Sequence, residues 1–306
     1  MVVVITGPTA VGKTKLSVEI AKKINGEIIN ADSTQIFKEL DIATAKVTKE
    51  EMENIPHHLI DIKNINEDYT VFDYQKDCRN KIDEIINKNK TPILVGGTGL
   101  YIKAALYDYK FNKEEIKNDY SNYTNKELYN KLLEINPKTE IHENNRKRIE
   151  RELDKYSNNS VNNEKTDKLL YDTIFIGLTT DREILYNRIN NRVDQMINNG
   201  LIEEAKKIYN TGIRTKAVLT PIGYKELFDY FDKKCTLEDS IELIKQRSRR
   251  YAKRQYTWNR HQFNLKWFDV NFNNFNNTIN KVLEYIEEVN KWKDKIISHG
   301  MNTLWE

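Results

Sequence analysis

Residues 7–14 of the chain could bind a phosphate group. They read Gly-Pro-Thr-Ala-Val-Gly-Lys-Thr and fit the pattern G-x-x-x-x-G-K-[ST]. In this pattern the glycines let backbone N–H groups surround a phosphate at a helix N-terminus, where the helix dipole adds positive charge. Lys13 would supply a point charge to a diphosphate, and the Thr14 hydroxyl could bind Mg²⁺. The motif predicts binding of a diphosphate or a triphosphate, but it does not require ATP. The predicted P-loop consists of Gly7, Pro8, Thr9, Ala10, Val11, Gly12, Lys13 and Thr14.

Two further groups of polar residues come directly after predicted strands. Asp-Ser-Thr-Gln (32–35) follows the second strand, and Gly-Gly-Thr-Gly (96–99) follows the third. Because parallel strands end at one edge of a sheet, we expect Asp32 and Thr98 beside the P-loop. A carboxylate next to a bound diphosphate can act as a general base. The alternatives for Asp32 are the N-cap of the next helix and a carboxylate associated with Mg²⁺.

A basic segment, residues 245–261, carries seven lysines and arginines, three aromatic residues and no acidic residue. Arg247, Arg250 and Arg254 are three and four positions apart, so they share one face of a helix. Such a cluster suits the phosphates of a nucleic acid. A solvated helix face with its aromatic residues in the core is the alternative. A smaller basic cluster occupies residues 146–151.

Two pairs of residues have weaker patterns. Arg188 and Arg192 lie four positions apart on the helix predicted after the last strand, and could hold phosphate oxygens as lid arginines do in P-loop kinases. A solvent-facing pair is the alternative. His57 and His58 have no nearby acidic or cysteine partners in the sequence, which favours a structural role over a metal site.

The elements that position these residues indicate an α/β protein. Short runs of apolar, β-branched residues predict strands that are buried on both faces of a parallel sheet. Helical spacing separates them, starting at Lys13 and again over residues 71–89, so the crossovers are right-handed. A strand before residues 7–14 and a helix after them also favour a P-loop over a chance glycine-rich turn. The predicted strands are Val2–Thr6, 27–31, 92–95 and 173–178.

Residues 108–170 interrupt this alternation. The segment is rich in Lys, Glu, Asn and Tyr and has no buried-strand pattern, but apolar spacing predicts a helix that ends near Pro137. The predicted architecture is therefore a P-loop NTPase-like parallel sheet core, built from residues 1–107 and 171–306, with a helical insertion at 108–170. A helix is also predicted from about residue 278 to residue 297.

Composition excludes several classes of protein. The 306 residues include 49 Lys and Arg against 46 Asp and Glu, so the net charge of +3 creates no global field for nucleic acid. No apolar run reaches the ~18 residues of a membrane span, and the first residues do not resemble a signal peptide. The two cysteines, Cys78 and Cys235, form neither a disulfide framework nor a zinc site. We therefore expect a reduced, cytoplasmic protein without zinc and without a membrane partner.

Together these motifs resemble the bacterial tRNA dimethylallyltransferases, also called tRNA isopentenyltransferases, of the IPP transferase family. The resemblance runs from Val2 to about Trp267 and depends on several separate blocks, of which only the P-loop is generic. The other blocks are Asp-Ser-Thr-Gln (32–35), Asp-Ile-Ala-Thr-Ala-Lys (41–46), Pro-His-His-Leu-Ile-Asp (56–61), Val-Gly-Gly-Thr-Gly-Leu-Tyr (95–101), Arg-Lys-Arg-Ile-Glu-Arg (146–151), Arg-Val-Asp-Gln-Met (192–196), Ile-Gly-Tyr-Lys-Glu (222–226) and Ala-Lys-Arg-Gln-Tyr-Thr-Trp (252–258).

The resemblance implies transfer of a dimethylallyl group from dimethylallyl diphosphate to N6 of the adenosine on the 3′ side of the anticodon in tRNA. The diphosphate would occupy the P-loop with Mg²⁺ and Arg192, Asp32 would be the base, and Thr98 would contact the reacting nucleotide. A flipped-out adenosine is required, because a stacked base cannot enter such a pocket. The implied contacts to the tRNA anticodon stem-loop are Asp32, Ser33, Thr34, Gln35, Thr98, Lys147, Arg148, Arg151, Arg249, Lys253 and Arg254.

The sequence departs from the family pattern at Phe37, Ala43, Val47 and Glu143, where Tyr, Gly, Pro and Pro are usual. None of these changes removes a predicted phosphate ligand or the predicted base. Two other functions remain open from the residues themselves. One is a P-loop kinase of a nucleotide or small metabolite, and the other is a noncatalytic, nucleotide-gated RNA-binding protein. A kinase with a small acceptor needs neither a basic aromatic helix nor a long polar insertion, so both features argue against the kinase.

Overall fold

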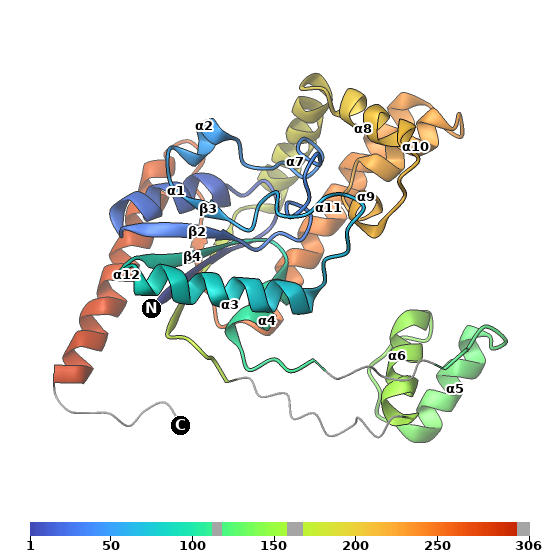
Figure 1. Ribbon diagram of the computed structural model, residues 1–306, viewed down its shortest axis with the longest axis horizontal. Coiled ribbons are helices and arrows are strands. Elements are labelled where there is room, and N and C mark those ends of the chain that lie inside the picture. The colour runs from blue at the N-terminus through green and yellow to red at the C-terminus, as the bar shows by residue number, and fades with distance from the viewer. Residues whose placement is uncertain (112–117, 158–167, 299–306) are drawn as a thin grey trace. The chain divides into compact units, whose positions relative to one another are not determined.

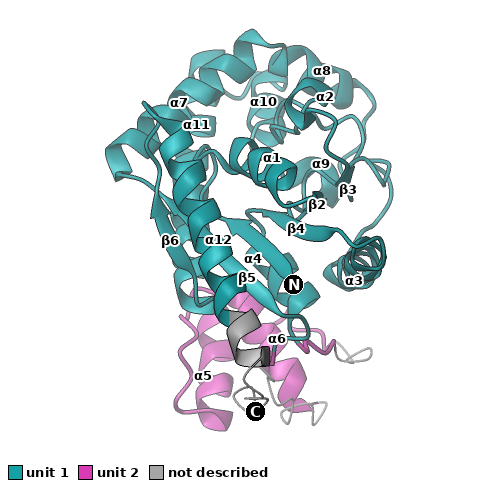
Figure 2. Ribbon diagram, turned by 90° about the vertical axis from the view of Figure 1, so that its left-hand side faces the viewer, with its two compact units in different colours: residues 1–107, 169–306 teal, residues 108–168 magenta. Residues whose placement is uncertain are grey.

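The computed structural model describes residues 1–111, 118–157 and 168–298, and these residues form two compact units (Figures 1 and 2). The first unit combines Met1–Tyr107 with Leu169–Glu306, and the second unit is Asp108–Lys168. Each unit has its own cluster of buried apolar side chains. The two units are therefore described separately.

A six-stranded parallel sheet lies at the centre of the first unit, as the sequence predicts, and its strand order is β3-β2-β4-β1-β5-β6. The four predicted strands are its four central strands. Two short edge strands were not predicted from the sequence. The strands are β1 (Val2–Thr6), β2 (Gly26–Asn30), β3 (His57–His58), β4 (Thr91–Gly96), β5 (Thr173–Thr179) and β6 (Lys266–Asp269).

Helices cover both faces of the sheet (Figure 1). The crossover helices α1 and α3 begin at Lys13 and Val71, as the sequence predicts. The longest helix, α11, contains the basic segment and begins at a capping box between Thr236 and Asp239. The helices of this unit are α1 (Lys13–Lys23), α2 (Lys49–Met52), α3 (Val71–Asn87), α4 (Gly99–Leu106), α7 (Arg182–Asn198), α8 (Leu201–Asn210), α9 (Lys216–Leu219), α10 (Tyr224–Phe231), α11 (Leu237–Gln262) and α12 (Phe275–Ser298).

The alternation of side chains along β1 divides the core into two layers. Val2 and Val4 belong to the same buried apolar cluster as residues of α3 and α4, whereas Val3 and Ile5 belong to the cluster that contains residues of α1, α7 and α12. Successive side chains of a strand point to opposite faces, so a strand that is apolar throughout is buried on both sides. This packing fixes the sheet, and with it the edge where the loops after β1, β2 and β4 meet.

The second unit contains two described helices, α5 (Asn125–Ile135) and α6 (Arg146–Ser157). A capping box between Thr124 and Glu127 starts α5. Apolar side chains four positions apart in each helix pack the two helices together, with one more from the connecting segment. The buried residues are Leu128, Leu132, Ile141, Ile149 and Leu153.

Candidate active site

The P-loop, residues 7–14, connects β1 to α1. Gly7 has a φ of 146°, and a Cβ there would lie 2.6 Å from the carbonyl oxygen of Leu178. Gly12 has a φ of 99° and directly precedes α1. Both conformations favour glycine, since L side chains rarely adopt them. The loop therefore ends at the N-terminus of α1, where backbone N–H groups are available to an anion.

The Lys13 side chain folds over this loop. Its Nζ donates hydrogen bonds to the carbonyl oxygens of Gly7 and Pro8 at 3.0 and 2.8 Å. Burial lowers the pKa of Lys13 to about 8, while the nearby Asp32 carboxylate raises it and the Arg192 guanidinium lowers it. Lys13 is therefore close enough to both side chains to interact electrostatically.

Two arginines of α7 also contact the P-loop. Arg192 donates a hydrogen bond to Thr9 Oγ1 at 3.1 Å, and Arg188 donates to the carbonyl oxygen of Ala10 at 3.1 Å. The Arg188 guanidinium also lies over the ring of Phe272, 3.7 Å from its centroid. Burial lowers the pKa of both arginines. Arg192 is partly buried and does not face solvent, whereas Arg188 is exposed although it also binds the P-loop.

Asp32 follows β2 and lies in a turn. Its Oδ1 accepts hydrogen bonds from the backbone N–H and the hydroxyl of Thr34 at 3.0 and 2.7 Å. The described chain between Asp32 and Thr48 contains no α-helix, so Asp32 is not a helix cap. Among the described residues none donates a hydrogen bond to Asp32 Oδ2, and Asp32 is partly exposed.

Thr98 connects the end of β4 to the turn at Asp32. Its Oγ1 accepts a hydrogen bond from the backbone N–H of Ser33 at 3.1 Å, and its own N–H donates to the carbonyl oxygen of Ala31 at 3.1 Å. Gly96 passes so close to Ala31 that a Cβ would lie 2.2 Å from the Ala31 carbonyl. The residues predicted from three separate segments are therefore at one edge of the sheet.

Helix α11 packs against the loop of Gly97, Thr98 and Gly99. A Cβ at Gly99 would lie 2.1 Å from the Trp258 indole. The Tyr251 hydroxyl interacts with Thr98, and burial together with the charge of Asp32 raises the pKa of Tyr251. The basic segment thus has one face in contact with the candidate active site.

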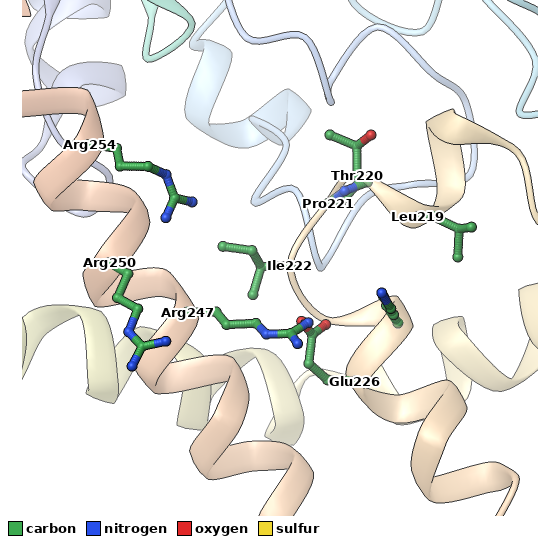
Figure 3. Close-up of a pocket in the computed structure, with 9 residues that line it drawn as sticks. Leu219, Thr220, Pro221, Ile222, Glu226, Arg247, Arg250 and Arg254 are labelled. Carbon is green, nitrogen blue, oxygen red and sulfur yellow. The ribbon is translucent and has the colours of Figure 1, made fainter. Parts of the chain in front are cut away.

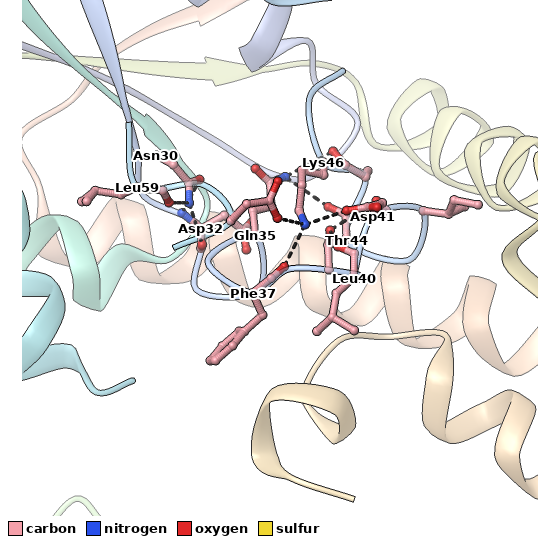
Figure 4. A network of polar contacts seen from close by, with 12 residues as sticks. Asn30, Asp32, Gln35, Phe37, Leu40, Asp41, Thr44, Lys46 and Leu59 are labelled. Carbon is pink, nitrogen blue, oxygen red and sulfur yellow. Dashed lines mark hydrogen bonds and ion pairs between the residues drawn. The ribbon is translucent and has the colours of Figure 1, made fainter. Parts of the chain in front are cut away.

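Residues 35–46 form a loop beyond the Asp32 turn, held in place by two side chains (Figure 4). Gln35 Nε2 donates to two backbone carbonyl oxygens of this loop at 3.1 and 3.2 Å. Lys46, whose side chain is 5% exposed, pairs with Asp41 at 2.6 Å and Asp61 at 2.5 Å. The motif at residues 41–46 is therefore a folded support for the Asp32 turn.

Glu204 of α8 holds the same loop from outside. Its carboxylate accepts hydrogen bonds from three consecutive backbone N–H groups, those of Asp41, Ile42 and Ala43, at 2.9 to 3.2 Å. It also accepts a hydrogen bond from the Tyr224 hydroxyl at 2.7 Å. Sequence reasoning did not find Glu204, because nothing in its neighbourhood along the chain indicates this role.

A basic pocket of about 290 Å³ lies between α11 and the segment that joins α9 to α10 (Figure 3). Arg247 pairs with the buried Glu226 in this pocket, and Arg250 and Arg254 come from the same helix. The three arginines predicted to share a helical face therefore line one cavity. The complete lining is Leu219, Thr220, Pro221, Ile222, Lys225, Glu226, Arg247, Arg250 and Arg254.

The predicted RNA-contacting cations have different environments. Lys253 and Arg254 are exposed on α11, whereas Arg249 donates a hydrogen bond to Asn190 of α7 at 2.6 Å. In the second unit, Lys147, Arg148 and Arg151 are exposed on α6. Their neighbour Arg146 instead binds the carbonyl oxygens of Tyr120 and Tyr123 and the carboxylate of Glu150. The predicted cations of α6 are thus on its solvent side.

His57 and His58 have structural roles. His57 Nδ1 lies 2.8 Å from the carbonyl oxygen of Ile55, and burial lowers the pKa of His57. His58 Nε2 lies 2.7 Å from Glu27, which also pairs with Lys90. Among the described residues, no group of three or more His, Cys, Asp or Glu side chains could hold a metal ion. No helix in the described part of the chain is long and apolar enough to cross a bilayer.

The parallel sheet and the P-loop after β1 define an α/β protein of the P-loop type. The sequence model of the family described as IPP transferase matches residues 35–262. A tRNA dimethylallyltransferase from Anoxybacillus flavithermus is 48% identical over 298 residues, covering 94% of this chain and 96% of that protein. One from Bacillus cereus is 46% identical over 301 residues, covering 94% of each. The chain therefore belongs to the IPP transferase family.

Two solved structures have the same fold. A tRNA isopentenylpyrophosphate transferase from Bacillus halodurans superposes with a TM-score of 0.77 at 42% identity, covering 97% of this chain and 99% of that one. A eukaryotic dimethylallyltransferase, described as acting on tRNA, has a TM-score of 0.75 at 33% identity, covering 88% of this chain and 73% of that one. The predicted fold class is thus confirmed.

Proposed function

We propose that this chain transfers the dimethylallyl group of dimethylallyl diphosphate to N6 of the adenosine on the 3′ side of the anticodon in tRNA. The observation that carries the proposal is the position of Asp32 within electrostatic range of Lys13 on the P-loop. A base for the acceptor and a cation for the diphosphate are then at the same edge of the sheet. Membership of the IPP transferase family supports the same reaction and disfavours a kinase or a noncatalytic RNA-binding protein.

The acceptor half of the reaction needs a base. The exocyclic amine of adenine is a poor nucleophile, because its lone pair is delocalised into the ring, so it needs placement and a proton acceptor. As N6 attacks C1 of the dimethylallyl group, the C–O bond to the diphosphate breaks and a proton of N6 passes to Asp32 Oδ2. The hydroxyl of Thr98, which accepts a hydrogen bond from Ser33 of the Asp32 turn, would contact the nucleotide.

The leaving group is a multiply charged anion. Backbone N–H groups of the P-loop, Lys13 and Arg192 stabilise the charge that develops on the bridging oxygen. Arg192 is held over the loop by its bond to Thr9, so its charge is in place before the reaction. Arg192 therefore needs no rearrangement as the C–O bond breaks.

Mg²⁺ is the cofactor we propose for the diphosphate. Thr14, the second residue of α1, offers a hydroxyl oxygen beside the P-loop, and Mg²⁺ prefers oxygen ligands completed by phosphate and water. When bound, the ion would neutralise part of the charge of the diphosphate. Thr14 would be its protein ligand.

The tRNA would be held through its anticodon stem-loop, in the cytoplasm. Residues of the Asp32 turn would surround the flipped adenosine, and exposed cations would bind the phosphates of the stem-loop. Lys253 and Arg254 on α11 flank the face that contacts the Gly97–Gly99 loop. RNA phosphates bound by these cations would therefore be next to the active site. The proposed contacts are Asp32, Ser33, Thr34, Gln35 and Thr98, then Arg249, Lys253 and Arg254, then Lys147, Arg148 and Arg151.

A direct assay tests this function. The protein is incubated with dimethylallyl diphosphate, Mg²⁺ and unmodified tRNA, and the digested nucleosides are analysed by mass spectrometry. We expect an adenosine that carries one dimethylallyl group at the position after the anticodon. Phosphate transfer from a nucleoside triphosphate to a small molecule, with unmodified tRNA, would instead support the kinase.

A further inference from the structure

Gln255 is a buried polar residue of α11 that contacts two loops of the active site. Its Oε1 accepts a hydrogen bond from the backbone N–H of Thr9 at 2.8 Å, and its Nε2 donates to the carbonyl oxygen of Gly97 at 3.1 Å. The orientation of the amide is fixed by these partners, since one is a donor and the other an acceptor. The side chain therefore bridges the P-loop and the loop that contains Thr98.

There is no free space at the Gly97 end of this bridge. A Cβ at Gly97 would lie 1.9 Å from Gln255 Nε2, so the glycine is required by the approach of the amide. Thr9 is held a second time, through its side chain, by Arg192. The position of the P-loop at Thr9 is thus determined jointly by α7 and α11.

A neutral amide is one of the few side chains that can make both bonds. Of the twenty residue types, only Asn and Gln combine an acceptor oxygen with an N–H donor on one planar, uncharged group. A packing role would be met equally by an apolar side chain of the same length. The chemistry of the two contacts, rather than the volume, distinguishes Gln at this site.

We propose that Gln255 is a positioning residue that sets the distance between the P-loop and Thr98, and so between the diphosphate and the adenosine amine. The proposal rests on the proposed function. Errors of about 1 Å in the relative placement of two reactants lower rates by about a hundredfold. Gln255 touches neither reactant in this arrangement and acts through Thr9 and Gly97.

The first test is Gln255→Met, which keeps the length of the side chain and removes both hydrogen bonds. We expect kcat/KM for dimethylallyl diphosphate to fall about tenfold to a hundredfold, with a higher KM for the diphosphate and a lower kcat. The Kd for tRNA, measured by direct binding, should not change. A packing role predicts wild-type kinetics for the folded variant, so unchanged kinetics overturn the proposal.

A second variant, Gln255→Glu, separates hydrogen bonding from shape. An ionised carboxylate accepts from Thr9 but repels the carbonyl oxygen of Gly97, whereas a protonated carboxyl can donate to it. Burial raises the pKa of a carboxyl group, so lowering the pH should restore the activity of this variant relative to the wild type at the same pH. If the relative activity of Gln255→Glu does not depend on pH and equals that of Gln255→Met, the proposed role of the two hydrogen bonds is contradicted.

Gln262→Met is the matched control. Gln262 is on the same helix and accepts a hydrogen bond from Lys103 at 2.9 Å, outside the two loops. It should leave the kinetics unchanged, and an equal loss in both variants would overturn the proposal. If the wild type does not modify tRNA, the proposed function fails instead. Calorimetric binding of inorganic diphosphate to the wild type and Gln255→Met still tests the bridge, which predicts weaker binding by the variant.

Discussion

Thr98 Oγ1 accepts a hydrogen bond from the backbone N–H of Ser33, with 3.1 Å between the two atoms, although the residues are 65 positions apart. The bond joins the ends of β4 and β2, between which the acceptor nucleotide would have to fit. It adds a contact from β4 to those that Asn30 makes with the Asp32 backbone. A change at Thr98 should therefore affect catalysis through this contact as well as through the nucleotide.

Thr98→Val removes the hydroxyl with little change of volume. The Ser33 N–H then loses its acceptor in a partly buried site, which costs about 1–3 kcal/mol. We expect a decrease in kcat/KM for tRNA of at least about tenfold, measured in steady-state assays. Thr98→Ser keeps the hydroxyl and should retain most of the activity. Equal activity of the Val and Ser variants would mean that the hydroxyl has no role.

We expect the binding of diphosphate to depend on pH through the charge of Lys13. Its pKa of about 8 lies below the ordinary value because of burial, so the ammonium group loses its charge as the pH rises through about 8. The affinity for inorganic diphosphate, measured by calorimetry, should therefore decrease above that pH. Lys13→Arg remains charged, and its affinity relative to that of the wild type should increase over the same range. A constant ratio of the two affinities would exclude Lys13 as the titrating group.

We expect the exposed cations of α11 to make the affinity for tRNA depend on the salt concentration. Replacing Lys253 or Arg254 with Gln should reduce the slope of log K against log salt by about 1 for each phosphate that is no longer neutralised. Arg249→Gln should have a smaller effect, because Arg249 already binds Asn190. Lys88→Gln, on the surface beyond α3, is the control. Unchanged slopes at both positions would indicate that this face of α11 is simply solvated.

The central strands could be predicted from the sequence because they are buried on both faces. Val2–Thr6 is apolar throughout, since Val2 and Val4 face one layer of helices and Val3 and Ile5 the other. The edge strands could not be predicted. Strand β3 has only two residues, both histidines, and β6 has only two aromatic residues between two charged ones. Both edge strands are defined only by their pairing with a neighbouring strand, β3 with β2 and β6 with β5.

The P-loop could be predicted because its chemistry is contained in eight consecutive residues. The contacts that orient it could not, since Gln255 is 246 positions from Thr9. A signal was nevertheless present in α11. Ala252, Gln255 and Asn259 are buried and spaced three and four positions apart, so polar residues occupy the core-facing stripe of the helix. Polar side chains in such positions usually have specific hydrogen-bond partners.

The last prediction tests whether Asp32 is the general base. Asp32→Asn keeps the oxygen that accepts from the N–H and hydroxyl of Thr34, so the turn should be preserved. The amide cannot take up a proton from the adenosine amine, and loss of a general base lowers rates by about 10²–10⁴-fold. Binding of tRNA and dimethylallyl diphosphate should remain close to that of the wild type.

Single-turnover kinetics with saturating enzyme measures this step, because it excludes product release. Asp181→Asn is the matched control, since Asp181 caps α7 through its Oδ1 and an Asn can make the same bonds. It should react like the wild type. If Asp32→Asn also transfers the dimethylallyl group at nearly the wild-type rate, Asp32 only shapes the turn, and the proton must pass to another group.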